Sequence, residues 1–206
     1  MDPVTTQLPD SWRTRIQAYQ PRLVAPGSRQ AAVMLLLAPG TAGPELLLTR
    51  RAFHLSTHAG EVSLPGGNRE TIDSSLYHTA LRETREEAGL SDEPERLGQL
   101  DSLYAKSGIE VSAFVSTLPN KPVLKACPDE VADLFWLPLV DLLDNPPEYK
   151  WFERHGRQWQ VPFFYHNQWT IWGMTGMILV NLINVLNESQ WPSFHDEWAK
   201  NPMDPD

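Results

Sequence analysis

The chain has 206 residues, a formal net charge of −9, a hydrophobic fraction of 41% and one cysteine, a composition expected of a single domain with a sizeable core. The single Cys127 excludes an intramolecular disulfide and a cysteine zinc cluster, and the acidic balance without a long Lys/Arg run argues against nucleic-acid binding. No basic, apolar leader opens the chain, and the longest apolar stretch, residues 171–186, is too short to span a membrane, so we expect a cytoplasmic protein without a membrane partner.

The N-terminal part of the chain alternates polar segments with apolar runs. Asp10 and Ser11 precede residues 12–19 as capping residues of a predicted helix, and residues 21–30 are interpreted as a linker. The continuous apolar run 31–38 is typical of a buried strand. The other elements predicted here are a turn over 41–44, a strand over 45–51, a short extended segment over 61–64 and a turn at Gly66-Gly67.

Residues 74–89 are predicted to form a helix that is capped by Ser74 or Ser75 and ends at Gly89. At about 100° per residue, Glu83, Glu86 and Glu87 share one arc of this helix. Their mutual repulsion costs a few tenths of a kcal/mol for each close pair, and a hard divalent cation, Mg²⁺ or Mn²⁺, would offset it. A separate, less polar arc, which can face a core, carries Tyr77, Ala80, Leu81, Thr84 and Ala88.

The second half of the chain contains shorter apolar runs and many tryptophans. Predicted elements are strands over 97–104, 111–118 and 134–137, a helix over 139–143, a hairpin of 151–152 with 158–165, and a helix over 170–187. We expect the core and pocket walls to include Trp136, Trp151, Trp159, Trp169 and Trp172. The pattern predicts an α/β fold, an α/β/α sandwich with a mixed β-sheet over residues 31–188. It is preceded by a helix and linker (1–30) and followed by a loosely packed acidic tail (189–206).

The segment around the acidic helix resembles the signature box of the Nudix hydrolases. That box runs Gly, five residues, Glu, seven residues, Arg-Glu, an apolar residue, any residue, Glu-Glu, any residue, Gly. Asp73 stands here in place of the first Glu, one extra residue separates it from Arg82, and Thr84 replaces the apolar residue. The positions that match the box are Gly67, Arg82, Glu83, Glu86, Glu87 and Gly89.

Residues 46–67, LLLTRRAFHLSTHAGEVSLPGG, resemble the additional motif of the coenzyme A pyrophosphatase branch of this family. That branch also tolerates an Asp and the longer spacing in the box. Ser56 stands where the branch has an arginine, Ala52 replaces a serine and Leu64 replaces a phenylalanine. The matching positions are Arg51, Leu55, His58, Gly60, Val62, Pro65, Gly66 and Gly67. Segments 129–131 and 172–175 also resemble this branch, so the resemblance covers about residues 30–185.

The resemblance implies a Nudix diphosphatase that uses Mg²⁺ or Mn²⁺ and cleaves coenzyme A or its derivatives to 3′,5′-ADP and 4′-phosphopantetheine. Because Ser56 replaces a cationic residue, a second hypothesis is hydrolysis of another nucleoside diphosphate-linked compound, such as ADP-ribose or NADH. A third is a Nudix-fold binding module without turnover, although such modules usually lack part of the acidic set. The resemblance also implies that the chain can form a homodimer.

The predicted site residues fall into three groups. Glu130 is interpreted as a metal ligand or as the base that activates water, with an ordinary exposed acid as the alternative. Arg82 either orients the carboxylates or forms a plain pair with Glu86 four residues away. The complete prediction is metal ligands Glu83, Glu86 and Glu87, catalytic residues Glu86, Glu130 and Arg82, and substrate-binding residues Arg51, His58, Gly66 and Gly67.

Weaker candidates accompany these groups. Glu61 and Asp73 are further possible ligands or bases. Arg51 can contact a substrate phosphate with two N–H groups, whereas His54 and His58 are either neutral hydrogen-bond donors near the site or structural supports of their loop. A pantetheine groove could be lined by Trp172, Met174 and Phe164, for which core packing is the alternative.

Overall fold

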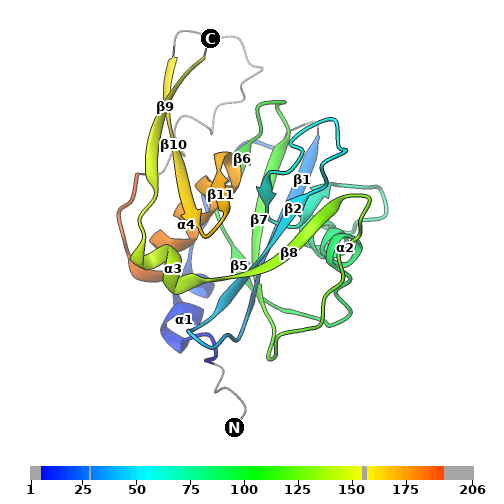
Figure 1. Ribbon diagram of the computed structural model, residues 1–206, viewed down its shortest axis with the longest axis vertical. Helices are drawn as coiled ribbons and strands as arrows, with labels where there is room; N and C mark the ends of the chain where they lie inside the picture. Colours follow the sequence, from blue (N-terminus) through cyan, green and yellow to red (C-terminus); the bar gives the residue numbers. More distant parts are fainter. Residues whose placement is uncertain (1–5, 28, 155–156, 193–206) are drawn as a thin grey trace.

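A mixed β-sheet between helices organises the molecule (Figure 1). A computed structural model describes residues 6–27, 29–154 and 157–192. The larger, eight-stranded sheet contains β1 (Gln30–Ala38), β2 (Glu45–Arg51), β3 (Val62–Ser63), β4 (Gly66–Asn68), β5 (Glu95–Gln99), β6 (Leu103–Tyr104), β7 (Glu110–Thr117) and β8 (Val131–Pro138). A three-stranded sheet contains β9 (Glu148–Arg154), β10 (Arg157–His166) and β11 (Trp169–Trp172). The helices are α1 (Asp10–Ala18), α2 (Leu76–Ala88), α3 (Leu139–Asp144) and α4 (Gly173–Asn187).

The centre of the larger sheet is the parallel pair β1 and β7, in register from Gln30 opposite Glu110 to Leu37 opposite Thr117. The other pairs of this sheet are antiparallel. Because successive side chains of a strand point to opposite faces, β1 supplies two cores. Leu35 and Leu37 join the core that contains α1 and α4, whereas Met34 and Leu36 join the core beneath α2. The predicted α/β/α sandwich is therefore confirmed, with α2 on one face and α1 and α4 on the other (Figure 1).

Helix α2 forms where the acidic segment predicts it. The Ser75 hydroxyl accepts a hydrogen bond from the His78 N–H at the N-terminus, and Gly89 ends the helix with φ 67, a left-handed conformation that glycine adopts without strain. The predicted core-facing arc is confirmed at Ala80, Leu81, Thr84 and Ala88, which are all buried; Tyr77 is partly buried. Glu87 is also buried, so one carboxylate of the acidic arc lies inside the protein.

Several predicted boundaries are wrong. Helix α1 begins at Asp10 after Pro9, without a side-chain cap, so Asp10 and Ser11 lie inside the helix. The strand predicted over 97–104 is two strands, because the backbone N–H groups of Asp101 and Ser102 donate to the Asn181 side chain and the Arg22 carbonyl instead of to β7. The predicted turn at Gly66-Gly67 is part of β4, which pairs with β1.

The C-terminal half also departs from the prediction. Residues 169–172 form β11 rather than the first turn of the last helix, because these aromatic and β-branched residues pair with β10. Trp151, predicted in a core or pocket wall, is 64% exposed. Within the described ranges no helix combines the length and the apolar character that crossing a membrane requires. Of the tail predicted to be loosely packed, residues 193–206 lie outside the described residues.

Candidate metal centre

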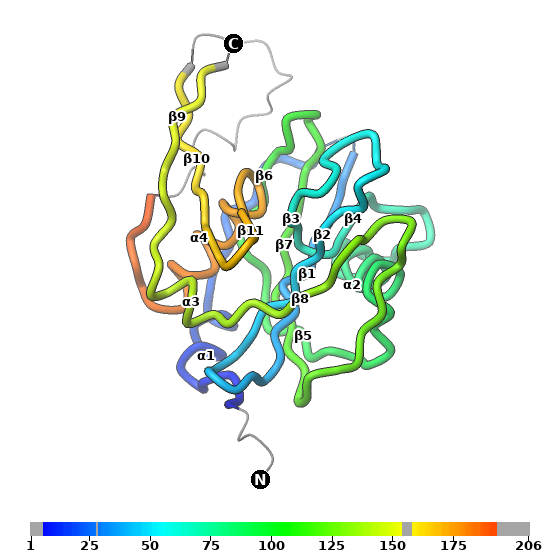
Figure 2. The backbone as a smooth tube through the Cα atoms, in the orientation of Figure 1, coloured from blue at the N-terminus to red at the C-terminus, as the bar shows by residue number. Residues whose placement is uncertain are grey.

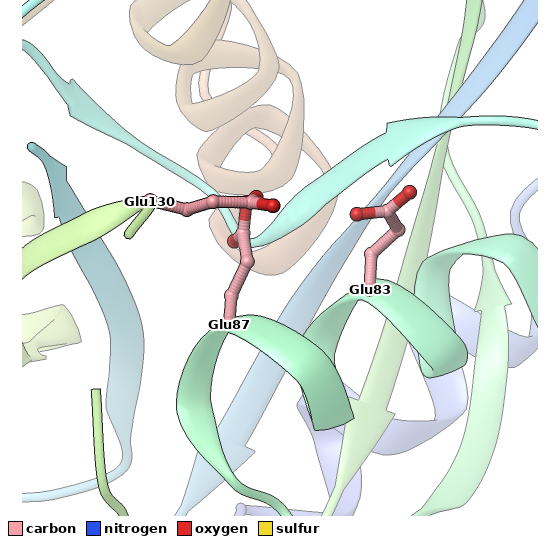
Figure 3. A group of neighbouring side chains, drawn as sticks. All are labelled: Glu83, Glu87 and Glu130. Atoms are coloured by element: carbon pink, nitrogen blue, oxygen red, sulfur yellow. The ribbon is translucent and has the colours of Figure 1, made fainter. Parts of the chain in front are cut away.

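Three carboxylates meet between α2 and the beginning of β8 (Figure 3). Glu83 and Glu87 lie one turn apart on α2, and Glu130 reaches across from the residue before β8. One oxygen of each carboxylate lies within 4.8 Å of the others. Oxygen ligands of this kind are those that Mg²⁺ and Mn²⁺ prefer. The structure thus brings together Glu83, Glu87 and Glu130, which we call the carboxylate group.

Backbone contacts fix Glu130 beside α2. Before it enters β8 the chain runs back past α2 (Figure 2), and the Cys127 N–H donates to the Glu87 carbonyl over 2.9 Å. The Ala52 N–H, just after β2, donates to the Glu130 carbonyl over 2.8 Å. The pairing of β2 with β8 includes an irregularity between Arg50 and Arg51. Glu130 is therefore positioned by two elements distant in sequence.

The electrostatics of the carboxylate group favour a cation. Burial, followed by the charges of Glu83 and Glu130, raises the pKa of Glu87 to about 8, although the Gly66 N–H donates to its Oε2. Burial also raises the pKa of Glu83. A carboxylate in such surroundings is costly to ionise unless a positive charge lies near it. The chemistry and spacing of these donors fit a divalent cation.

Gly66 and Gly67 lie where a side chain would collide with neighbouring groups. A Cβ atom on Gly67 would lie 2.4 Å from the Glu83 Oε1, and one on Gly66 would lie 2.3 Å from the Ala32 carbonyl oxygen. Gly66 also has φ 156, which residues with a side chain rarely adopt. Strand β4 can therefore lie against both β1 and the carboxylate of Glu83 only because it begins with two glycines.

We predict that Gly67→Ala weakens Mn²⁺ binding by about tenfold or more, because the new methyl group displaces the Glu83 carboxylate. Titration with Mn²⁺, followed by electron paramagnetic resonance of the free ion, measures the change. Gly40→Ala is the matched control, since its Cβ would lie 2.3 Å from the carboxylate of Glu45, which lies outside the carboxylate group. Equal Mn²⁺ affinities of the two variants would contradict the prediction.

Arg82 connects the carboxylate group to the loop before α2. Its Nε donates to Asp73 Oδ1 over 3.0 Å and its Nη2 to the Asn68 carbonyl over 3.0 Å. Its Nη1 lies 3.0 Å from Glu83 Oε1 and 2.8 Å from Glu86 Oε2. Arg82 therefore orients two carboxylates, and it does form the pair with Glu86 that was the alternative interpretation.

Asp73 serves Arg82 rather than the carboxylate group. The Arg82 guanidinium lowers the pKa of this buried carboxyl to about 2, and the Glu70 N–H and Thr79 hydroxyl also donate to it. Its oxygens are thus occupied by protein donors. Sequence reasoning treated Asp73 as a weak candidate ligand or base and missed this supporting role. The available signal was its position where the signature box has a glutamate.

Glu86 lies outside the carboxylate group, although the sequence places it on the same arc of the helix. Its side chain is 57% exposed and turns toward Arg82. Glu86 is the third residue after Glu83, and the two carboxylates contact the same Arg82 guanidinium. Glu86 thus stands at the outer edge of the site, where a second cation or a substrate can approach from solvent.

Arg51 is the nearby cation with unused hydrogen-bonding capacity. Its Nε is buried and finds no hydrogen-bond partner among the described residues, and its positive charge lowers the pKa of Glu87 against the stronger effect of burial. An orphaned guanidinium N–H beside acidic groups is suited to an oxygen of an incoming phosphate.

The two histidines of the same segment have local partners. His58 Nδ1 lies 3.0 Å from Glu61 Oε2, and His54 Nε2 lies 3.1 Å from the Asp129 carbonyl. Both histidines are exposed, and neither they nor Glu61 belong to the carboxylate group. The apolar candidates pack with other side chains: Phe164 is 2% exposed and Met174 contacts the same core, while Trp172 stacks on Phe163 with ring centroids 5.5 Å apart.

Comparison with known proteins identifies related chains. Residues 27–160 match the model of the NUDIX domain. The chain is 37% identical over 180 residues to the uncharacterized Nudix hydrolase NudL of Yersinia enterocolitica, covering 85% of this chain and 90% of that protein. It is 38% identical over 164 residues to the NudL of Photorhabdus laumondii, covering 79% of this chain and 87% of the relative.

Solved structures with a similar fold include a Nudix hydrolase from M. smegmatis, RenU, with a TM-score of 0.48 and 25% identity over 57% of this chain and 75% of that one. Another is the NUDIX domain of Shewanella oneidensis NrtR complexed with ADP ribose, with a TM-score of 0.45 and 22% identity over 62% of this chain and 79% of that one.

Proposed function

This chain belongs to the Nudix hydrolase family, and from that premise we propose that it hydrolyses the diphosphate bond of coenzyme A or its derivatives. The products are 3′,5′-ADP and 4′-phosphopantetheine. The observation that carries the proposal is the carboxylate group, in which a buried glutamate of raised pKa lies within 4.8 Å of two further carboxylates beside the orphaned N–H of Arg51. One site therefore contains carboxylates that can bind a metal ion and an arginine that can bind a phosphate.

Mg²⁺ or Mn²⁺ is the cation that these donors fit. Glu83, Glu87 and Glu130 would hold it, with the exposed Glu86 available to a further ion at the edge of the site. A divalent cation held there would supply positive charge for the diphosphate oxygens of the substrate. Arg82 keeps Glu83 and Glu86 in position through its contacts to Asp73 and Asn68.

The remaining roles follow from access and charge. Arg51 binds a phosphate oxygen through its unpartnered Nε, and the Gly66-Gly67 segment lies beside Glu83 and Glu87, with the Gly66 N–H donating to Glu87 Oε2. Glu130 is the exposed member of the carboxylate group, whereas Glu87 is buried. We therefore assign to Glu130 the acceptance of a proton from the attacking water, through the carboxylate oxygen that does not hold the cation. His58 lies on the exposed loop before β3, where it can contact the outer part of a substrate.

The choice of coenzyme A rests on the motif at residues 46–67. Ser56, which replaces an arginine of that motif, is exposed on the same loop as His58. This substitution removes a cation that a phosphate could contact, so hydrolysis of ADP-ribose or NADH is the second candidate function.

A panel of diphosphates separates these functions. The protein is incubated with coenzyme A, acetyl-coenzyme A, ADP-ribose and NADH in the presence of Mg²⁺ or Mn²⁺, and the products are resolved by ion-exchange chromatography and mass spectrometry. We expect 3′,5′-ADP and 4′-phosphopantetheine from coenzyme A at the highest rate. Turnover of ADP-ribose without turnover of coenzyme A would overturn the substrate assignment, and no turnover of any compound would favour a binding module.

We also predict that Glu86→Gln lowers turnover by at least about 100-fold, because it removes a charge that faces Arg82 and the outer edge of the site. Steady-state kinetics and circular dichroism report activity and folding in parallel. Glu93→Gln is the control, since Glu93 is exposed and pairs with Arg85 just beyond α2. An unchanged rate for Glu86→Gln would exclude this residue from the chemistry.

A further inference from the structure

A second cleft, of about 360 Å³, lies between the beginning of α2 and the strands β5 and β7. Its lining contains none of the residues of the carboxylate group and neither Arg51, Gly66 nor Gly67. Its volume is within the range of small-molecule sites. The cleft is therefore separate from the candidate metal centre, although both include residues of α2.

The floor of this cleft is polar where a buried strand is expected to be apolar. On the face of β7 that lies beneath α2, Glu110 and Ser112 line the cleft and are 6% and 1% exposed. The equivalent face of the neighbouring β1 carries Ala32 and Met34, which pack in the core. Buried polar groups are costly unless they are hydrogen-bonded, yet within the described ranges Ser112 Oγ receives only a long contact of 3.5 Å from Gln99 Nε2. The Ser112 hydroxyl can therefore serve a bound ligand.

Two exposed arginines, Arg69 and Arg96, also line the cleft. The Arg96 guanidinium lies 5.0 Å from the ring centroids of both Tyr77 and Phe114, and Arg69 Nη1 donates to the Gln30 side chain. Among the residues that the structure describes, neither arginine forms an ion pair with a carboxylate. In a chain of net charge −9, two arginines without an acidic partner on one cleft make a local site for an anion.

The other charges of the cleft agree with this assignment. Glu110 is the acidic residue of the lining, and its Oε2 already accepts from the Gly27 N–H and from Gln30 Nε2. The first residues of α2, Leu76 and Tyr77, also line the cleft. Ser75 caps the N–H of His78, which follows these two residues. The N–H groups of Leu76 and Tyr77 belong to the first turn, where N–H groups without a partner in the helix favour a negative charge.

We propose that this cleft is a second, non-catalytic binding site for a small phosphate monoester. The phosphate lies between Arg69, Arg96 and the beginning of α2, while a hydroxyl group of the ligand faces Ser112. The proposal is independent of the substrate of the metal centre, because it requires neither a divalent cation nor turnover.

The test uses AMP as the probe and the full chain, with divalent cations removed by EDTA. Isothermal titration calorimetry compares the wild type, the double variant Arg69→Gln/Arg96→Gln and a charge-matched control, Arg13→Gln/Arg85→Gln, whose arginines pair with Glu95 and Glu93 outside the cleft. Two-dimensional ¹H–¹⁵N NMR of the wild type locates the bound ligand. We expect one equivalent of AMP to bind, about tenfold or more weakly in the cleft variant and unchanged in the control.

The NMR shifts on AMP addition are expected at the amides of residues 75–77 and 112. Three results would overturn the proposal: no binding to the wild type, equal binding to the two double variants, or shifts confined to residues 51, 66, 67 and 83–87. Circular dichroism tests whether each variant is folded. If the cleft variant does not fold, the amides of the wild type that shift on AMP addition decide between the cleft and the metal centre.

Discussion

Replacing Glu87 by glutamine is expected to lower turnover of a diphosphate substrate by about 1000-fold. Glu87 is 4% exposed and lies in the carboxylate group with Glu83 and Glu130. The glutamine keeps the shape of the side chain but removes the charge that holds a cation, and the loss of several kcal/mol of transition-state stabilisation corresponds to about three decades in rate. Steady-state kinetics at saturating Mg²⁺ or Mn²⁺ give the value.

Glu45→Gln is the matched control for that experiment. Glu45 is also buried, at 8% exposure, but it pairs with Lys121 on another part of the sheet. We expect this control to lose stability without losing the catalytic step. A Glu87→Gln enzyme that retained more than about a tenth of the wild-type rate would contradict a role of Glu87 in cation binding.

The stability of the metal-free protein is expected to fall as the pH rises from about 5 to about 8.5, and Glu87→Gln should remove most of this fall. The folded protein holds a proton on Glu87 up to a pKa of about 8, whereas the ordinary pKa of a glutamate, which applies to the unfolded chain, is 4.5. Between these values the folded state binds more protons than the unfolded state, so the free energy of unfolding decreases with rising pH. At about 1.36 kcal/mol for each pKa unit, the effect is on the order of 3–5 kcal/mol.

Urea unfolding in the presence of EDTA, across this pH range, measures the effect in the wild type and the variant. The contribution of Glu87 to the free energy of unfolding is fully present below its pKa in the unfolded chain. It is lost as the pH rises past its pKa in the folded protein. The Asp73 carboxyl, whose pKa is lowered to about 2, acts in the opposite direction but only in strong acid. Parallel pH profiles of wild type and Glu87→Gln would show that Glu87 is not the group responsible.

Added Mn²⁺ should raise the stability of the wild type at pH 8 and have much less effect on the variant.

The sequence predicted those parts of the fold that have a strong local signal. The apolar run 31–38 became β1, and the helix from Ser75 to Gly89 has the cap and the left-handed end that these residue types favour. Strand β11 escaped prediction because four residues of aromatic and β-branched type directly precede a helix. A short apolar run of this kind fits either structure until its partner strand, β10, is known.

The candidate site was predictable to a similar extent. Helical spacing places Glu83 and Glu87 on one face, but it cannot show that Glu87 is buried and that Glu86 turns to Arg82. Glu130 lies 43 residues beyond Glu87 in the sequence, and its approach depends on the pairing of β2 with β8. The contact between Asp73 and Arg82 likewise crosses a loop. Contacts of this tertiary kind have no periodic pattern in the sequence.

The most direct test is a crystal of the wild-type protein soaked with Mn²⁺ and a non-hydrolysable diphosphate analogue, with anomalous scattering measured at the manganese edge. We expect an anomalous peak within coordination distance, about 2.0–2.3 Å, of carboxylate oxygens of Glu83, Glu87 and Glu130, and the peak should be absent in Glu87→Gln. A fully occupied diphosphate without a peak beside these carboxylates, or a peak of equal height in the variant, would contradict the assignment of this group as the metal centre.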